Sequence, residues 1–120
     1  ALFDEAVAVF PDLDIAHGHR CWYYALYGHA AAAMDSCDTA VDLATQENAG
    51  KIRLWRGAAR YLAGDRDGAL EDLQAAQQAW SMGSVSTHDY ERAARRWLEA
   101  LGDGRDILDE RELERLRRWF

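Results

Sequence analysis

Proline and long apolar runs are both scarce in this chain of 120 residues. Pro11 is the only proline, the residue that most strongly interrupts a helix, whereas alanine, the best helix former, is abundant. The longest apolar-rich run, residues 21–34, is interrupted by Gly28 and His29 and falls short of the ~20 residues that span a bilayer. No secretory signal pattern precedes it. We therefore expect one all-α domain without a membrane-spanning segment.

Basic residues are also under-represented. The chain has 14 Lys and Arg residues against 21 Asp and Glu residues, which gives a formal net charge of −7. An acidic surface repels the phosphate backbone, and nucleic-acid binding needs a basic patch or stripe. The charge balance therefore excludes nucleic acid as the expected partner.

Cysteine occurs only as Cys21 and Cys37. Two cysteines in a chain of this length do not form the disulfide framework of a small secreted domain. We therefore expect two buried free thiols and a reducing compartment, the cytoplasm. A disulfide between them is the less favoured alternative.

The common catalytic motifs are absent too. The sequence has no nucleophile elbow, no glycine-rich phosphate loop and no His-Glu-x-x-His motif. His17 and Cys21 share a helix face, but a structural zinc ion needs four ligands and only His29 and Cys37 remain as candidates. We therefore expect no enzyme activity, cofactor or metal, with both His17 and His19 on the surface; a small metal-binding or enzymatic domain using His17 and Cys21 is the alternative.

The clearest pattern present is a helical hairpin over residues 51–80. Gly64 is suited to the left-handed backbone conformation that ends a helix, and Asp65 is suited to cap the next one. A shift of 36 residues aligns this hairpin with an upstream copy, in which Gly28 is equivalent to Gly64. The same shift aligns Leu26 with Leu62, Ala33 with Ala69, Asp35 with Glu71, Cys37 with Leu73 and Ala40 with Ala76. Such a fixed period indicates a repeat array.

These features resemble the tetratricopeptide (TPR) repeats, which have a period of about 34 and an Ala-x-x-x-Phe core in the second helix. The corresponding pairs here are Ala69 with Leu73 and Ala33 with Cys37. More narrowly, the chain resembles a C-terminal TPR tail of bacterial multidomain proteins over roughly residues 13–118. The residues that carry this likeness are Cys21, Trp22, Gly28, Cys37, Ala40, Val41, Arg53, Arg56, Gly57, Ala59, Arg60, Gly64, Asp65, Gly68 and Ala69, and more loosely Trp97 and residues 112–114.

The resemblance implies an all-α solenoid of about two full repeats, with a leading helix and a degenerate C-terminal capping hairpin. We expect one domain over residues 1–120, divided into residues 1–10, 13–45, 51–80 and 87–120. The last helix should point Leu113, Leu116 and Phe120 inward. Because the chain starts at Ala1 rather than Met, we expect it to be part of a longer protein.

Charged residues recur at helical spacing on two neighbouring predicted helices. Three arginines occupy positions i, i+3 and i+7, where the TPR pattern has apolar residues: Arg53, Arg56 and Arg60. Three aspartates upstream have the same spacing: Asp35, Asp38 and Asp42. In an antiparallel arrangement Asp42 faces Arg53, Asp38 faces Arg56 and Asp35 faces Arg60. We favour a structural ladder of ion pairs, because arginine is rarely buried unpaired. An anion pocket is the alternative, and Asp72 is a competing partner.

The family's first helices line a concave groove that binds peptides. By the repeat spacing the lining here is Ile15, Gly18, Trp22, Ala25, Lys51, Leu54, Ala58 and Tyr61. We expect it to bind an apolar peptide, a protein partner or a neighbouring domain of the same chain, unless the capping helices fill it. The predicted function is a non-catalytic interaction or regulatory module. A structural homodimerisation unit is a further alternative, and the sequence leaves the oligomeric state open.

Overall fold

The computed structural model describes residues 2–118, and within them it is entirely helical, which confirms the predicted all-α class. None of these helices is long and apolar enough to cross a membrane. The predicted inward position of Phe120 lies outside the described residues. The helices are α1 (Leu2–Val9), α2 (Asp14–Leu26), α3 (Ala30–Leu43), α4 (Ala49–Leu62), α5 (Arg66–Ser81), α6 (His88–Gly102) and α7 (Glu110–Arg117).

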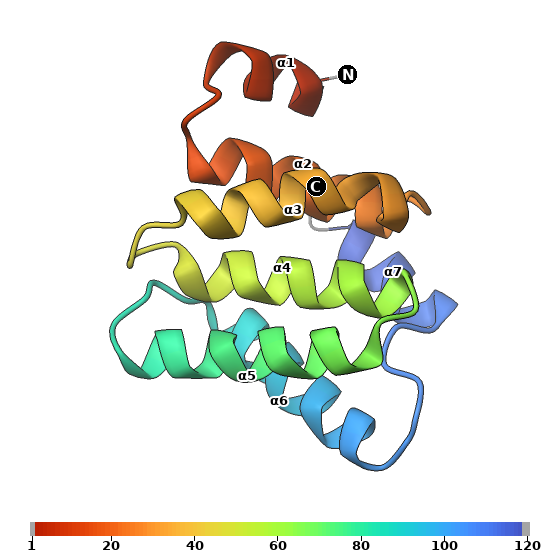
Figure 1. Ribbon diagram of the computed structural model, residues 1–120. Coiled ribbons are helices and arrows are strands. Elements are labelled where there is room, and N and C mark those ends of the chain that lie inside the picture. The colour runs from red at the N-terminus through yellow and green to blue at the C-terminus, as the bar shows by residue number, and fades with distance from the viewer. Residues whose placement is uncertain (1, 119–120) are drawn as a thin grey trace.

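Two tight turns make two helical hairpins, α2–α3 and α4–α5 (Figure 1). Gly28 and Gly64 have φ angles of 88° and 92°, the left-handed conformation that a side chain disfavours. The Asp65 carboxylate then accepts a hydrogen bond from the Gly68 backbone N–H at 2.8 Å and caps α5. The predicted roles of Gly64 and Asp65 are thereby confirmed.

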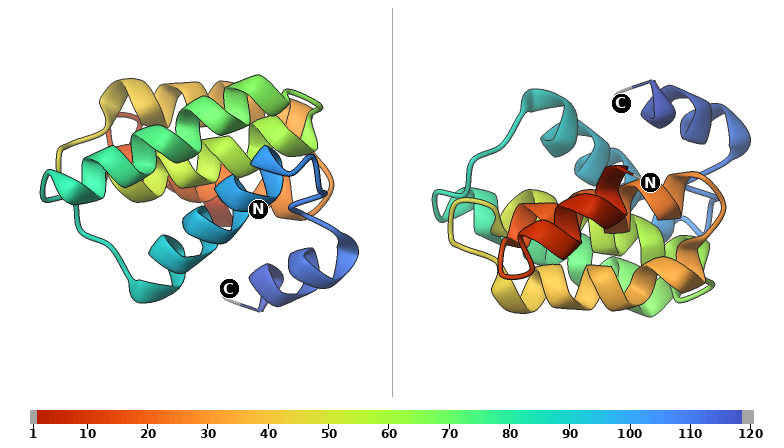
Figure 2. Two further views of the ribbon diagram at one scale, coloured as in Figure 1. Left: turned by 90° about the horizontal axis from the view of Figure 1, so that it is seen from below. Right: turned by 90° about the horizontal axis from the view of Figure 1, so that it is seen from above.

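The two hairpins stack side by side, and α2 and α3 both pack against α4. Helix α1 lies on the outer side of α2, at the far end from α5 (Figure 1). Helix α6 packs mainly against α5 and touches α4, and α7 reaches α2, so that both lie on the side of the row away from α3 (Figure 2). The core is therefore enclosed between the hairpins and the C-terminal helices, and Trp22, Leu54, Trp97 and Leu116 are all buried in it.

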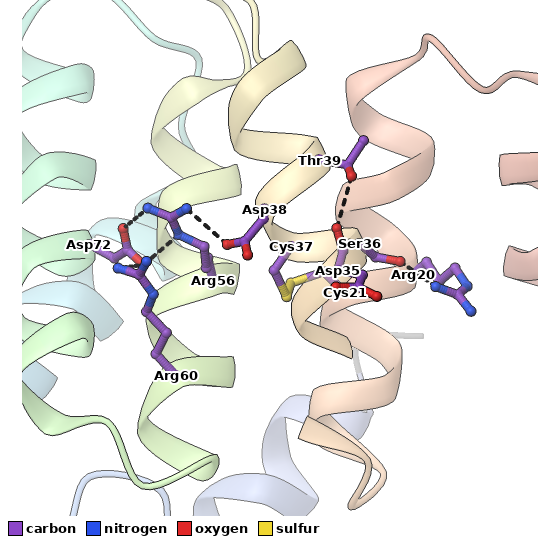
Figure 3. The surroundings of a disulfide bond; sticks show 10 residues. All are labelled: Arg20, Cys21, Asp35, Ser36, Cys37, Asp38, Thr39, Arg56, Arg60 and Asp72. Carbon is purple, nitrogen blue, oxygen red and sulfur yellow. Dashed lines mark hydrogen bonds and ion pairs between the residues drawn. A yellow bond between two sulfur atoms is a disulfide. The ribbon is translucent and has the colours of Figure 1, made fainter. Parts of the chain in front are cut away.

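The cysteines form a disulfide between α2 and α3 (Figure 3), so the prediction of two free thiols is wrong. Cys21 and Cys37 lie 16 residues apart with their Cα atoms separated by 4.8 Å. At the equivalent place in the second hairpin, Gly57 packs against Leu73. These two positions are thus in contact in both hairpins, which are related by a shift of 36 residues in sequence. A reducing compartment was inferred from free thiols, and that inference loses its basis.

The buried disulfide should add measurably to stability. Replacing both cysteines with alanine should lower the free energy of unfolding by about 3 kcal/mol, the magnitude associated with cross-linking a loop of this length. Urea unfolding of the wild type and the double variant measures this difference. Intact mass after alkylation in denaturant checks the bond itself: wild type should gain no alkyl groups without reductant. Alkylation of both cysteines under those conditions would contradict the disulfide.

Candidate functional site

The most concentrated set of charged side chains surrounds Asp72 on α5, which is completely buried. Arg56 on α4 binds it with two hydrogen bonds of 2.9 Å, from Nε to Oδ2 and from Nη2 to Oδ1. Arg53 donates to Oδ1 at 2.9 Å, and Arg60 forms an ion pair with Oδ2 at 3.2 Å. Three cations from successive turns of one helix therefore converge on a single carboxylate (Figure 3 draws Asp72 with Arg56 and Arg60).

Only one rung of the predicted ladder is present. Arg56 Nη1 donates to Oδ1 of Asp38 on α3 at 3.2 Å. Within residues 2–118, Asp35 and Asp42 form no ion pair with Arg60 or Arg53, so these two predicted rungs are wrong. Asp72 replaces them because it lies in the interior, where a carboxylate must be compensated, whereas Asp35 and Asp42 are exposed to water.

The same arrangement occurs 36 residues earlier, a relation that the sequence analysis missed. Arg20 and Arg56 are 36 residues apart, and so are their partners on the following helix, Ser36 and Asp72. Arg20 donates from Nη1 to the Ser36 hydroxyl and from Nε to Asp4 of α1 at 2.6 Å. Each arginine thus joins its own hairpin to the helix before it, and the 36-residue shift would have found both.

The arginine cluster is occupied by its own protein. All three guanidinium groups of α4 are bound to Asp72, and the one most deeply buried, that of Arg56, also binds Asp38. A positively charged pocket for an external anion would need at least one of these cations to be available. The geometry therefore favours the ion-pair interpretation over the anion pocket.

The partners of Arg56 should differ sharply in their contribution to stability. Asp72→Ala leaves a buried guanidinium without its main partner and should cost about 3–5 kcal/mol. Asp38→Ala should cost no more than about 1 kcal/mol, because the Asp38 side chain is 55% exposed. Chemical denaturation of both variants measures these values, with Asp35→Ala as the control at an exposed aspartate. Equal losses for Asp72→Ala and Asp38→Ala would contradict this assignment.

The predicted concave groove is not open. Trp22 is only 2% exposed and stacks on Trp55 with ring centroids 6.2 Å apart, and Leu54 is fully buried. Ile15, Lys51 and Tyr61 are half-buried. The prediction that Trp22 and Leu54 line a free binding surface is therefore wrong.

The C-terminal segment closes this side. The Tyr61 hydroxyl donates to Asp106 and accepts from the Ile107 backbone N–H at 3.3 Å. Arg117 of α7 donates from Nε to the Leu26 carbonyl oxygen at 2.6 Å, and Leu116 beside it is fully buried. Burial of Ile107, Leu108 and Leu116 explains why the chain itself covers much of the expected groove. A pocket of about 520 Å³ remains between α2, α4 and α7, next to Ala25.

Glu112 holds α7 to α6. Its carboxylate accepts from the Trp97 indole at 3.0 Å, from Arg96 at 2.6 Å and from Arg115 at 2.7 Å. Burial alone would raise the pKa of Glu112, but the hydrogen bonds from Arg115, Trp97 and Arg96 outweigh it and lower the pKa. A lowered pKa means that the ionised form stabilises the folded state, and this stabilisation is lost as pH falls through that value.

Glu112→Gln should therefore destabilise the protein in a pH-dependent way. The expected loss is about 1–2 kcal/mol at pH 7, the magnitude of hydrogen bonds to a charged group. The loss should shrink as pH falls below the unfolded glutamate pKa of about 4.3. Urea unfolding on both sides of that value, with Glu114→Gln as the exposed control on the same helix, measures the effect. An unchanged difference at acidic pH would show that the Glu112 charge does not hold α7.

His17 and Cys21 do not form a metal-binding pair. Cys21 is in the disulfide, and His17 is buried rather than on the surface, donating from Nε2 to the Pro11 carbonyl oxygen at 2.8 Å. Within residues 2–118 no three His, Cys, Asp or Glu side chains are grouped so that they could hold a metal ion. The candidate pair of the sequence thus serves the packing of α2.

Lys51 lies at a small pocket between α2, α4 and the start of α6. The pocket has a volume of about 140 Å³ and is lined by His19, Lys51, Trp55, Val85, Ser86, Thr87 and Tyr90. Burial and the Lys51 charge both lower the pKa of His19, which favours a neutral imidazole near pH 7. The rings of Trp55 and Tyr90 meet edge to face at 6.2 Å.

Within residues 2–118, helix α1 presents the two most exposed large apolar side chains. Leu2 and Val9, seven residues apart and hence on one helix face, are 73% and 67% exposed. Phe10 and Leu13, just beyond α1, are exposed as well. On the other side of α1, Phe3 packs against the rings of His19 and Tyr23. Among residues 2–118, the contacts of α1 therefore lie on the side of Phe3, away from Leu2 and Val9.

No protein-family model, curated protein or solved structure matches this chain.

Proposed function

We propose that this protein is a non-catalytic interaction module, a stack of TPR-like hairpins whose outer α1 surface binds a helix of a protein partner. The observation that carries this proposal is the exposure of Leu2 and Val9 on a helix with no buried residue. Monomeric proteins seldom leave neighbouring large apolar side chains in water, and such patches mark interaction sites. We call the outer side of α1, formed by Leu2, Val9, Phe10 and Leu13, the α1 surface.

The contacts of α1 support this role. Arg20 reaches back from α2 to Asp4 of α1, as Arg56 reaches back from α4 to Asp38 of α3. With respect to the next hairpin, α1 therefore has the position of a second helix. A second helix in such a stack packs against a first helix of its own hairpin, as α3 does against α2. Within residues 2–118 no helix takes that place beside α1.

The chemistry of the α1 surface favours a different protein over a second copy. Glu5 is exposed and lies between Leu2 and Val9 in the sequence. In an antiparallel pairing of two α1 helices, Glu5 would meet Glu5 of the other copy, and like charges at a helix contact are unfavourable. A helix with apolar residues at positions i, i+3, i+4 and i+7 and a central Lys or Arg fits better. The resemblance to TPR tails suggests that this chain is part of a larger bacterial protein, and the partner that supplies the helix is a separate protein.

The α1 surface should select such helices from a random pool. We expect panning of phage-displayed amphipathic helices against the whole chain to enrich apolar stripes flanked by a basic residue. Because truncating an interface anchor commonly costs more than 1 kcal/mol, Leu2→Gln with Val9→Gln should weaken binding of the enriched peptides by about 10-fold or more.

Leu70→Gln is the matched control, since Leu70 is an exposed leucine on α5, away from α1. Fluorescence anisotropy with the selected peptides measures all three affinities. Peptides that bind the double variant as tightly as the wild type would place the interaction elsewhere. A concentration-dependent dimer in sedimentation, abolished by the double variant, would assign the surface to self-association instead.

A further inference from the structure

The pocket around Lys51 offers positive charge and hydrogen-bond donors, with no acidic side chain in its lining. Lys51 is the only lysine of the chain and is half-buried. Within residues 2–118 it forms no ion pair. A partly buried cation without a carboxylate beside it favours a bound anion.

One hydroxyl group of the pocket, that of Thr87, can donate to a ligand, whereas the Ser86 hydroxyl already donates to the Thr87 carbonyl oxygen at 2.9 Å. Thr87 Oγ1 accepts a hydrogen bond from the Tyr90 backbone N–H at the start of α6, so its own O–H can donate elsewhere. His19 makes no hydrogen bond within residues 2–118, and a neutral imidazole keeps one N–H donor. Lys51, Thr87 and His19 thus come from three elements, α4, the α6 cap and α2, and all can donate into one space.

The charge of the site selects the class of anion. With His19 neutral, Lys51 supplies a single positive charge, which matches one carboxylate. A phosphate dianion would keep an excess negative charge inside a protein whose net charge is already −7. A volume of about 140 Å³ admits only a small group. Trp55, Tyr90 and the exposed Val85 supply an apolar wall for a short aliphatic part.

We propose that this pocket binds a small aliphatic monocarboxylate, with Lys51 paired to the carboxylate, Thr87 and His19 donating to it, and Trp55 contacting its aliphatic part. The site is separate from the α1 surface and does not depend on it. The same chemistry is presented by a free organic acid and by the last residue of a peptide.

The direct test is a nuclear magnetic resonance titration of the whole chain with N-acetylalanine, with N-acetylalaninamide as the uncharged match. We expect saturable shifts of the Trp55 indole N–H, the His19 ring and the Thr87 amide with the acid only. Lys51→Met should weaken binding by about 10-fold or more, the loss expected for a charge-assisted hydrogen bond. Lys51→Arg should retain most of the affinity. Arg111→Met, at an exposed cation on α7, is the matched control.

Two further probes separate the sources of the carboxylate. Tighter binding of acetyl-Gly-Gly-Ala than of propionate would assign the site to a peptide C-terminus, and equal binding would assign it to a free acid; either supports a carboxylate site. Absence of saturable shifts with N-acetylalanine, equal shifts with the amide, or tighter binding of inorganic phosphate would overturn the proposal. Should Lys51→Met fail to fold, Thr87→Val serves as the second variant, and unchanged affinity in it would likewise overturn the assignment.

Discussion

The arrangement of the hairpins depends on the ion pairs and hydrogen bonds that the buried Asp72 carboxylate makes with α4. A carboxylate without access to water is stable only when cations and hydrogen bonds replace its hydration. Here the two oxygens receive Arg56 in two parallel bonds and Arg53 and Arg60 at the flanks. These bonds fix α5 against three successive turns of α4. Because Arg56 also reaches Asp38, the same cluster ties the second hairpin to the first.

The first hairpin joins its two helices at the equivalent position with fewer charged groups. Arg20 occupies the place of Arg56, but its partner on the next helix is the hydroxyl of Ser36 instead of a carboxylate. Beside it, the Cys21–Cys37 disulfide joins the two helices covalently where the second hairpin has only a packing contact. The hairpins thus share a backbone arrangement and an apolar core, to which one adds buried ion pairs and the other a covalent link.

The sequence predicted local features well because they depend on neighbouring residues. Gly64 and Asp65 specify a turn and a cap by their own conformational preferences, and the helices follow from apolar spacing. The partners of the long arginine side chains were harder to predict. Helical spacing pairs Asp42 with Arg53, but spacing cannot show that Asp72 lies closer to Arg53. The sequence left open whether the capping helices fill the groove, because the loop after Gly102 does not encode the direction in which α7 docks, although the inward position of Leu116 was predicted correctly. Trp22 was therefore assigned to an open groove that α6 and α7 close.

The most direct test of this account is a double-mutant cycle between Arg56 and Asp72. Arg56→Leu leaves the buried Asp72 with only the flanking Arg53 and Arg60, and Asp72→Leu leaves the buried Arg56 with only the exposed Asp38. The double variant removes this central pair and fills its space with apolar groups. We predict that each single change is costly and that the double variant recovers most of the loss, with a coupling energy of about 2 kcal/mol or more in urea unfolding. Losses that add to within about 0.5 kcal/mol would show that this pair does not hold the hairpins together.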